Sequence, residues 1–200
     1  MNIPPQIESL TEALRHLPSL GPRQAARLAF YLTGAGKIYG QELAKNIMAL
    51  SDLSVCANCF FVCNQKNSLC EICNNPERNR QQILIVEKET DLLSIEDTGI
   101  YKGTYLVIGS IPKTGILSVE HQRRLQTTKT RIKRDHNGMI DEIIMGFGPS
   151  TLSDFHADTI IKELRGWTKK ISRLGRGLPT GAEIEFADPD TLSASFDTRR

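Results

Sequence analysis

Apolar side chains recur every three or four positions in residues 6–17, which is the spacing of an amphipathic helix. The turn that follows is predicted to place Gly21 in a left-handed conformation, and Pro22 suits the first position of a second helix. That helix ends at the glycine-containing segment 34–36, and a third helix is predicted at about 40–51. The first part of the chain is therefore expected to be helical.

From residue 82 onward the pattern changes to short apolar runs of the kind that form buried strands. Strands are predicted at 83–86, 105–108 and 142–145, with a fourth at 170–174, and helices are predicted at 91–98 and 155–165. Strands that alternate with helices form a mainly parallel sheet covered on both faces. This part of the chain is therefore predicted to be an α/β domain.

All five cysteines lie between these two parts, and four of them form two Cys-x-x-Cys knuckles. The knuckle residues are Cys56, Cys59, Cys70 and Cys73. Two knuckles at close range supply the four thiolates of a structural, tetrahedral Zn²⁺ site, which leaves no position open for a catalytic water. Disulfides in a secreted domain would be spread out to connect distant loops, whereas these cysteines are clustered, so disulfides are disfavoured. A redox Cys-x-x-Cys motif usually occurs once, whereas this chain has two.

Cys63 leaves one alternative open, since it could replace Cys59 and shorten the loop before Cys70. Cys59 is preferred because it has the two-residue spacing from Cys56 that a knuckle requires. Cys63 is then a spare thiol.

The bulk composition sets broad limits. An apolar content of 40% is enough for a core, and the net charge of +2 neither requires nor excludes nucleic acid. No apolar run approaches the roughly eighteen residues of a membrane span, and the N-terminus has no apolar signal region. A soluble, cytoplasmic protein with no membrane partner is expected.

Residues 17–28 resemble a helix-hairpin-helix motif. Its glycine-bearing turn would present backbone N–H groups to one DNA phosphate, and the second helix would point its positive end the same way. Arg23 and Arg27 lie four positions apart and so share one face of that helix. Binding of this kind is independent of sequence and sensitive to salt. The alternative is an ordinary helical hairpin with two exposed arginines.

A second basic segment, residues 123–134, contains six cationic side chains and no acid. They are Arg123, Arg124, Lys129, Arg131, Lys133 and Arg134. A solvated, mobile loop is the first interpretation, and an arm that contacts phosphates is the second.

Glu87 directly follows the first predicted strand, where α/β folds build their sites. It resembles the opening motif of the Toprim fold, whose enzymes use this Glu and a later Asp-x-Asp pair to hold magnesium. The third strand has no such pair, and Asp188 and Asp190 come too late in the chain. One carboxylate is a poor divalent-metal site, so catalysis is not expected.

The glycine-rich tail is expected to be turn-rich and to pack back on the sheet.

The order of these features resembles the RecR family of bacterial recombination mediators. The resemblance covers nearly the whole chain and is most specific at residues 17–28, at the second cysteine knuckle and at 176–188. It implies a helix-hairpin-helix region at 1–53, a zinc element at 54–77, a Toprim domain at 78–172 and a C-terminal tail at 173–200.

The same resemblance implies function. Such proteins are not enzymes, form ring-like tetramers that can encircle DNA, and act with RecO and RecF to load RecA on single-stranded DNA. It also implies DNA contact at Arg23 and Arg27. Three departures stand out: a long loop between the knuckles, a recast region after Gly109, and a segment at 148–154 that keeps one acid, Asp154, where the family has several. That loss puts the contact with RecO in doubt.

Two alternative functions remain. One is a Toprim nuclease or primase-like enzyme that uses Glu87 and magnesium. The other is a zinc-stabilised scaffold that binds proteins and no DNA. Sequence leaves the oligomeric state and the preferred DNA structure open.

Overall fold

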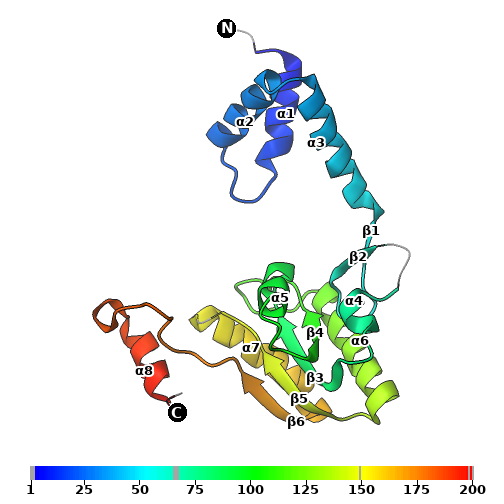
Figure 1. Ribbon diagram of the computed structural model, residues 1–200, viewed down its shortest axis with the longest axis vertical. Helices are drawn as coiled ribbons and strands as arrows, with labels where there is room; N and C mark the ends of the chain where they lie inside the picture. The colour runs from blue at the N-terminus through cyan, green and yellow to red at the C-terminus, as the bar shows by residue number, and fades with distance from the viewer. Residues whose placement is uncertain (1–2, 65–67, 149, 198, 200) are drawn as a thin grey trace. The chain divides into compact units, whose positions relative to one another are not determined.

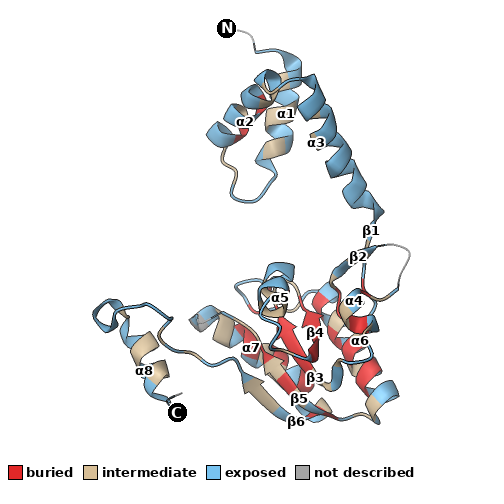
Figure 2. Ribbon diagram, in the orientation of Figure 1, coloured by how far each residue is buried: buried red, intermediate tan, exposed pale blue. Residues whose placement is uncertain are grey.

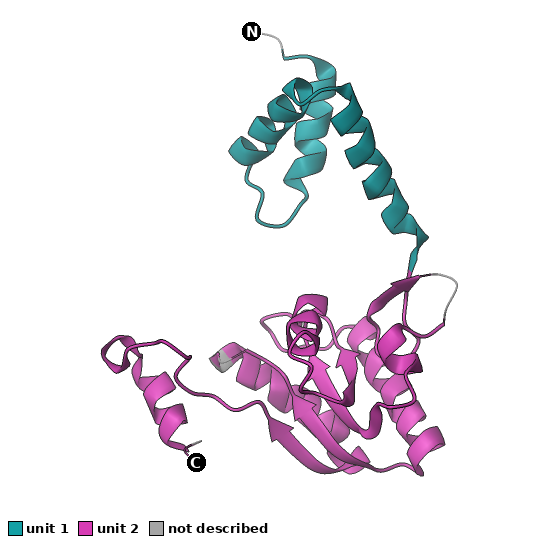
Figure 3. Cartoon of the chain, in the orientation of Figure 1, with its two compact units in different colours: residues 1–53 teal, residues 54–200 magenta. Residues whose placement is uncertain are grey.

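The computed structural model describes residues 3–64, 68–148, 150–197 and 199 (Figure 1). The chain divides into two compact units, Met1–Leu53 and Ser54–Arg200 (Figure 3). The predicted division into four parts is finer than this and stays a prediction. None of the described helices combines the length and the apolar content needed to cross a membrane.

The first unit contains the three predicted helices, α1 (Pro5–Arg15), α2 (Pro22–Gly34) and α3 (Lys37–Ala49), followed by a short 3-10 turn, η1 (Leu50–Asp52). Pro22 takes the first position of α2, as predicted. The prediction for Gly21 is wrong: its φ is −77°, and Ser19 has the positive φ of 65°. Gly21 precedes α2 as its N-cap, a position that needs an extended backbone, so the left-handed residue falls two positions earlier.

The first unit buries very little. Among residues 3–53 only Ala25 and Ala29, both on α2, are fully buried, and α3 has no buried residue (Figure 2). Large apolar side chains remain at its surface, including Tyr31, Ile38, Ile47, Met48 and Leu50. This unit therefore leaves several of its large apolar side chains exposed.

The second unit is built on a four-stranded sheet in the order β4-β3-β5-β6. Its strands are β3 (Asn79–Val86), β4 (Gly103–Val107), β5 (Ile140–Met145) and β6 (Thr168–Arg173). All three pairings are parallel. The connecting helices are α5 (Glu89–Glu96), α6 (Val119–His136) and α7 (Thr151–Leu164), with the 3-10 turn η2 (Arg165–Trp167) before β6. The α/β class and all four predicted strands are confirmed.

Alternate residues of β3 face two different layers. Ile83 and Ile85 pack with buried residues of α6 and α7. Leu84 and Val86 pack on the opposite face with Leu92 of α5 and with the four knuckle cysteines. The cysteine element, which contains β1 (Leu53–Val55), β2 (Val62–Asn64) and α4 (Glu71–Asn74), is therefore part of the covering of the sheet.

The basic segment 123–134 is not a loop, and the first interpretation of it is wrong. It lies within α6, whose N-terminus is capped by Ser118 and whose C-terminal cap Asn137 is left-handed with φ 55°. Leu125, Thr128 and Ile132 are buried on one face, at intervals of three and four residues. Only two of these three are apolar, which is why hydrophobic periodicity did not identify the helix.

The tail contains the 3-10 turn η3 (Ile184–Phe186) and helix α8 (Pro189–Asp197). The tail was expected to pack back on the sheet, but none of the described residues between 174 and 199 is buried, so it buries no side chain there (Figure 2). Polar contacts hold its start instead: Arg176 pairs with Asp154 of α7.

Candidate functional site

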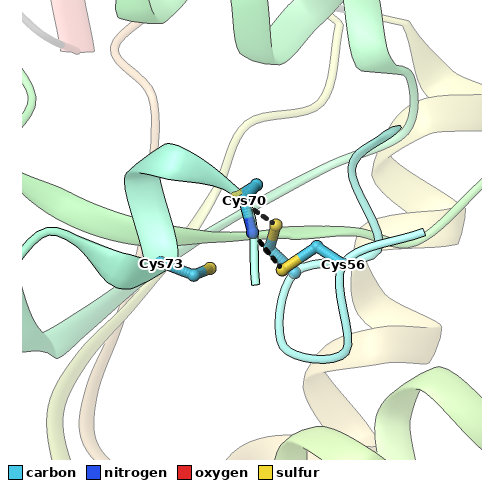
Figure 4. Close-up of side chains that lie close together, drawn as sticks. Cys56, Cys70 and Cys73 are labelled. Atoms are coloured by element: carbon cyan, nitrogen blue, oxygen red, sulfur yellow. Dashed lines mark hydrogen bonds between the residues drawn. The ribbon is translucent and has the colours of Figure 1, made fainter. Parts of the chain in front are cut away.

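The four knuckle cysteines converge at one buried point. Cys56 and Cys59 come from the turn between β1 and β2, Cys70 precedes α4 and Cys73 lies within it. Figure 4 shows Cys56, Cys70 and Cys73. Their four sulfur atoms all lie within 4.8 Å of one another, and the Sγ atoms of Cys59 and Cys70 are 3.5 Å apart.

These separations suit a tetrahedral metal ion. Zn–S bonds of about 2.3 Å place sulfurs about 3.8 Å apart in a tetrahedron. A set of four thiolates with no oxygen ligand favours a soft or borderline ion. The backbone N–H of Cys70 also donates to Cys56 Sγ at 3.3 Å, which stabilises negative charge on that sulfur. The four residues can therefore hold a metal ion.

Cys63 lies outside this group. Its half-buried side chain approaches Ser54, with the Ser54 Oγ and Cys63 Sγ atoms 3.6 Å apart. The structure thus brings together the set that includes Cys59 and not the alternative that includes Cys63.

The clustered thiols influence one another's ionisation. The hydrogen bond with Cys59 is the largest of several thiol contacts that lower the pKa of Cys56, and the same bond raises the pKa of Cys59. One thiol of the cluster therefore ionises readily while a neighbour resists, because adjacent thiolates repel without a cation between them.

The first knuckle covers the edge of the sheet. The backbone N–H of Val107, in edge strand β4, donates to Cys59 O at 2.8 Å. The Val107 carbonyl accepts from Nη1 of Arg124, also at 2.8 Å. Phe60, in the same knuckle, is buried with φ 63°, and the guanidinium carbons of Arg123 and Arg124 each lie 5.2 Å from its ring centroid.

Most of the basic side chains of α6 have partners within the fold. Arg123 and Arg124 pair with Glu120, Lys129 pairs with Glu163, and Arg134 pairs with Asp135.

Arg131 is buried and donates to the Asn58 carbonyl at 3.3 Å. Sequence reasoning missed these roles. The signal available was the position of Arg131 six residues after Leu125 and next to Ile132, which places it beside the buried face of the helix.

The hairpin arginines lie on α2, directly after the turn. Arg23 and Arg27 are both exposed, and within the described part of the chain neither forms an ion pair. Their spacing of four residues puts them on one face. Because the first N–H groups of a helix have no partner within it, the backbone N–H groups of Arg23 and Gln24 at the start of α2 can donate to an anion.

Glu87 follows β3, as predicted, and its partner is a histidine. Glu87 Oε1 lies 3.3 Å from Nδ1 of His156, and Nε2 of the same ring lies 3.0 Å from the Pro112 carbonyl oxygen. Since a carbonyl oxygen only accepts, Nε2 donates in that bond, and Nδ1 faces the Glu87 carboxylate. His156 itself is buried.

The other carboxylates considered for magnesium lie apart from Glu87. Asp188 caps α8 by accepting from the Thr191 backbone N–H at 2.9 Å and from its hydroxyl at 2.7 Å. Among the described residues, the four cysteines form the only group of three or more Cys, His, Asp or Glu side chains close enough to hold a metal ion. The Asp-x-Asp spacing at 188–190 is that of a helix start.

Comparison with known proteins agrees with this arrangement. A protein-family model described as "RecR, helix-hairpin-helix" matches residues 7–50, and one described as "RecR, C-terminal" matches residues 177–200. Proteins named "Recombination protein RecR" are similar over almost the whole chain. The one from Chloroflexus aggregans is 34% identical, and the one from Dehalococcoides mccartyi is 35% identical, each over 97% of this chain and 93% of the relative. The one from Roseiflexus castenholzii is 32% identical over 99% of this chain and 95% of the relative. At this identity and coverage, the chain belongs to the RecR family of recombination proteins.

Proposed function

We propose that this protein is a DNA-binding recombination mediator in recombinational DNA repair. It forms an oligomeric clamp on DNA and, with RecO and RecF, helps to load RecA on single-stranded DNA. It works in the cytoplasm, associated with the nucleoid, and has no catalytic activity of its own. The observation that carries the proposal is the pair of exposed arginines, Arg23 and Arg27, at the start of α2 in the helix-hairpin-helix segment.

The chemistry of this pair suits a phosphate backbone. Two guanidinium groups on one helix face, next to the unpaired N–H groups of a helix N-terminus, attract an anion without contacting base edges. DNA binding is then independent of sequence, and its affinity falls as counterions compete at higher salt.

The surface of the first unit supports self-association. Ile38 of α3 is 83% exposed and Met48 is 74% exposed, while the unit buries only two alanines fully among residues 3–53. Apolar side chains that one chain leaves in water favour contact with a second copy. A clamp requires such contacts between copies.

The four-cysteine group is proposed to hold one structural Zn²⁺ through Cys56, Cys59, Cys70 and Cys73. Their buried position, their separations and the absence of an oxygen ligand support this assignment. When bound, the ion would fix both knuckles against the sheet and would supply no open coordination position for chemistry.

The enzymatic alternative, a Toprim nuclease or primase that uses Glu87 and magnesium, is not favoured. Glu87 is engaged by His156, and no second carboxylate joins it among the described residues. A single paired carboxylate is a poor ligand set for magnesium.

Binding to gapped DNA across a series of salt concentrations tests the proposal. The double variant Arg23→Ala/Arg27→Ala should bind more weakly, and the slope of log affinity against log salt should fall by about 1 to 2. Lys37→Ala/Lys45→Ala is the matched control, because it removes the same charge from exposed positions of α3. An unchanged slope in the arginine variant, or an equal loss in the lysine variant, would contradict the assignment.

Incubation of the wild type with magnesium and plasmid or primed DNA tests the alternative. We expect no nicking and no synthesis. Nicking that is lost in Glu87→Ala would establish the enzymatic function instead.

A further inference from the structure

Arg131 is the one described residue with a buried side-chain polar atom that lacks a hydrogen-bond partner, its Nη2 atom. The residue is only 9% exposed and lies on α6 among residues that contact the sheet. A buried guanidinium without a carboxylate beside it is unfavourable unless another negative charge compensates for it.

The other terminal nitrogen of the guanidinium, Nη1, contacts the first cysteine knuckle. Nη1 donates to the carbonyl of Asn58, which is one of the two residues between Cys56 and Cys59. The Arg131 head group therefore lies against the knuckle that supplies half of the metal-binding thiols. Among the described residues of this turn, the Asn58 carbonyl is the only group that accepts a hydrogen bond from Arg131, and one neutral carbonyl does not neutralise a cation.

The charges around Arg131 point the same way. Burial lowers its pKa, whereas Cys73, Cys59, Asp135 and Cys56 raise it, with Cys73 the largest of these. Asp135 is engaged directly by Arg134. Four thiolates around a divalent cation retain a double negative charge, and Arg131 lies against the knuckle that supplies two of them.

We propose that Arg131 is the counter-charge of the four-cysteine metal site. Its guanidinium offsets the excess negative charge of the thiolates through the first knuckle, and the thiolates in turn compensate for its burial. Metal binding and the seating of α6 against the knuckle are then coupled. This inference rests on the proposed metal site.

Competition with a chromogenic chelator for Zn²⁺ tests the coupling in the full-length protein. Removing a residue that supports metal ligands from outside typically weakens metal binding about 10- to 100-fold. We expect Arg131→Met, which is similar in length but uncharged, to fall in that range. Lys133→Met is the control: it removes the same charge from an exposed position of the same helix and should leave Zn²⁺ affinity unchanged.

A second pair of variants separates charge from packing. Arg131→Lys keeps the positive charge and Arg131→Gln loses it, while both have shorter side chains. The Lys variant should bind Zn²⁺ more tightly than the Gln variant, and this comparison also serves if the Met variant does not fold. Equal Zn²⁺ affinity in the Lys and Gln variants, or in the wild type and Arg131→Met, would overturn the inference. A wild type that holds no metal would instead overturn the metal site itself, so the two failures are distinguishable.

Discussion

The two units of the chain differ in how they use their apolar residues. In the second unit, a parallel sheet buries side chains on both faces, and the cysteine knuckles complete one of those faces. In the first unit, three helices bury two alanines fully and leave Ile38, Met48 and their neighbours in solvent. The second unit supplies its own core, whereas the first unit leaves most of its large apolar side chains exposed.

The largest expected effect lies in the cysteine knuckles. Cys70→Ala, or removal of the metal by a chelator, should destabilise the second unit strongly, because a bound four-thiolate zinc ion contributes on the order of 10 kcal/mol to a small element. The measurement is thermal unfolding together with metal content and protease resistance. Cys63→Ala is the control, since Cys63 lies outside the cluster. A Cys70→Ala protein with normal metal content and normal unfolding would refute the role of the knuckles.

The two units should also differ in how much unfolding free energy is lost when an apolar side chain is shortened to alanine. Leu106→Ala, in the buried centre of the second unit, should cost about 2–5 kcal/mol of unfolding free energy, as deletions in a packed core do. Met48→Ala, on exposed α3, should cost less than about 0.5 kcal/mol in dilute protein.

Urea unfolding at several protein concentrations measures both values. If apolar residues of the first unit are covered in an oligomer, the cost of Met48→Ala should grow with protein concentration. A cost equal to that of Leu106→Ala at every concentration would remove the distinction between the units.

A smaller effect is expected at the pair of Glu87 and His156, in the polar interior of the second unit. His156→Ala should destabilise the fold by about 1–3 kcal/mol, because it leaves the Pro112 carbonyl and the Glu87 carboxylate without their partner. Glu87→Gln should cost less than about 1 kcal/mol, since an amide N–H can still donate to Nδ1. Urea unfolding measures both, and a larger loss in Glu87→Gln than in His156→Ala would contradict the pairing.

The smallest effect is expected in the tail, which, like helices α1 and α3 of the first unit, has no buried residue among those described. Hydrogen bonds from Arg176, and to a lesser degree the nearby Arg173, lower the pKa of Asp154. A lowered pKa stabilises the contact above the usual Asp value of about 4, and the stabilisation is lost as pH falls through the lowered value. Because Asp154 is about one-third exposed, the effect on stability should be below about 1 kcal/mol.

Amide hydrogen exchange of α8 in the wild type and in Asp154→Asn measures this contact. Exchange should be faster in the variant at neutral pH, and the difference should vanish at a pH well below 4. Asp158→Asn, which removes a partner of Arg173 but not of Arg176, should change exchange less. A difference that persists unchanged in acid would contradict the role of the carboxylate.

Local patterns were enough to predict much of the fold. Helical spacing identified the three helices of the first unit, and short apolar runs identified the four strands, because both signals depend on neighbouring residues alone. The spacing of the knuckles also selected the four cysteines that the structure brings together.

Other features depend on contacts between distant segments. Helix α6 was missed because its buried face includes Thr128 and Arg131, which hydrophobic periodicity does not count. The partner of Glu87 lies 69 residues further along the chain, so no local pattern points to it. The cap at Asp188 could have been recognised, since Asp-Pro followed by an acidic residue is a common helix start.

The contact between Cys59 and Val107 has a consequence for the order in which this protein forms. The second knuckle ends at Cys73, and strand β4, which the first knuckle contacts, begins some thirty residues later in the chain. At the roughly 5–20 residues per second of protein synthesis, the knuckles leave the ribosome a few seconds before β4 does. Both Cys-x-x-Cys pairs are thus synthesised before β4. The knuckle that bonds to the edge strand can therefore form before that strand is available to pair with it.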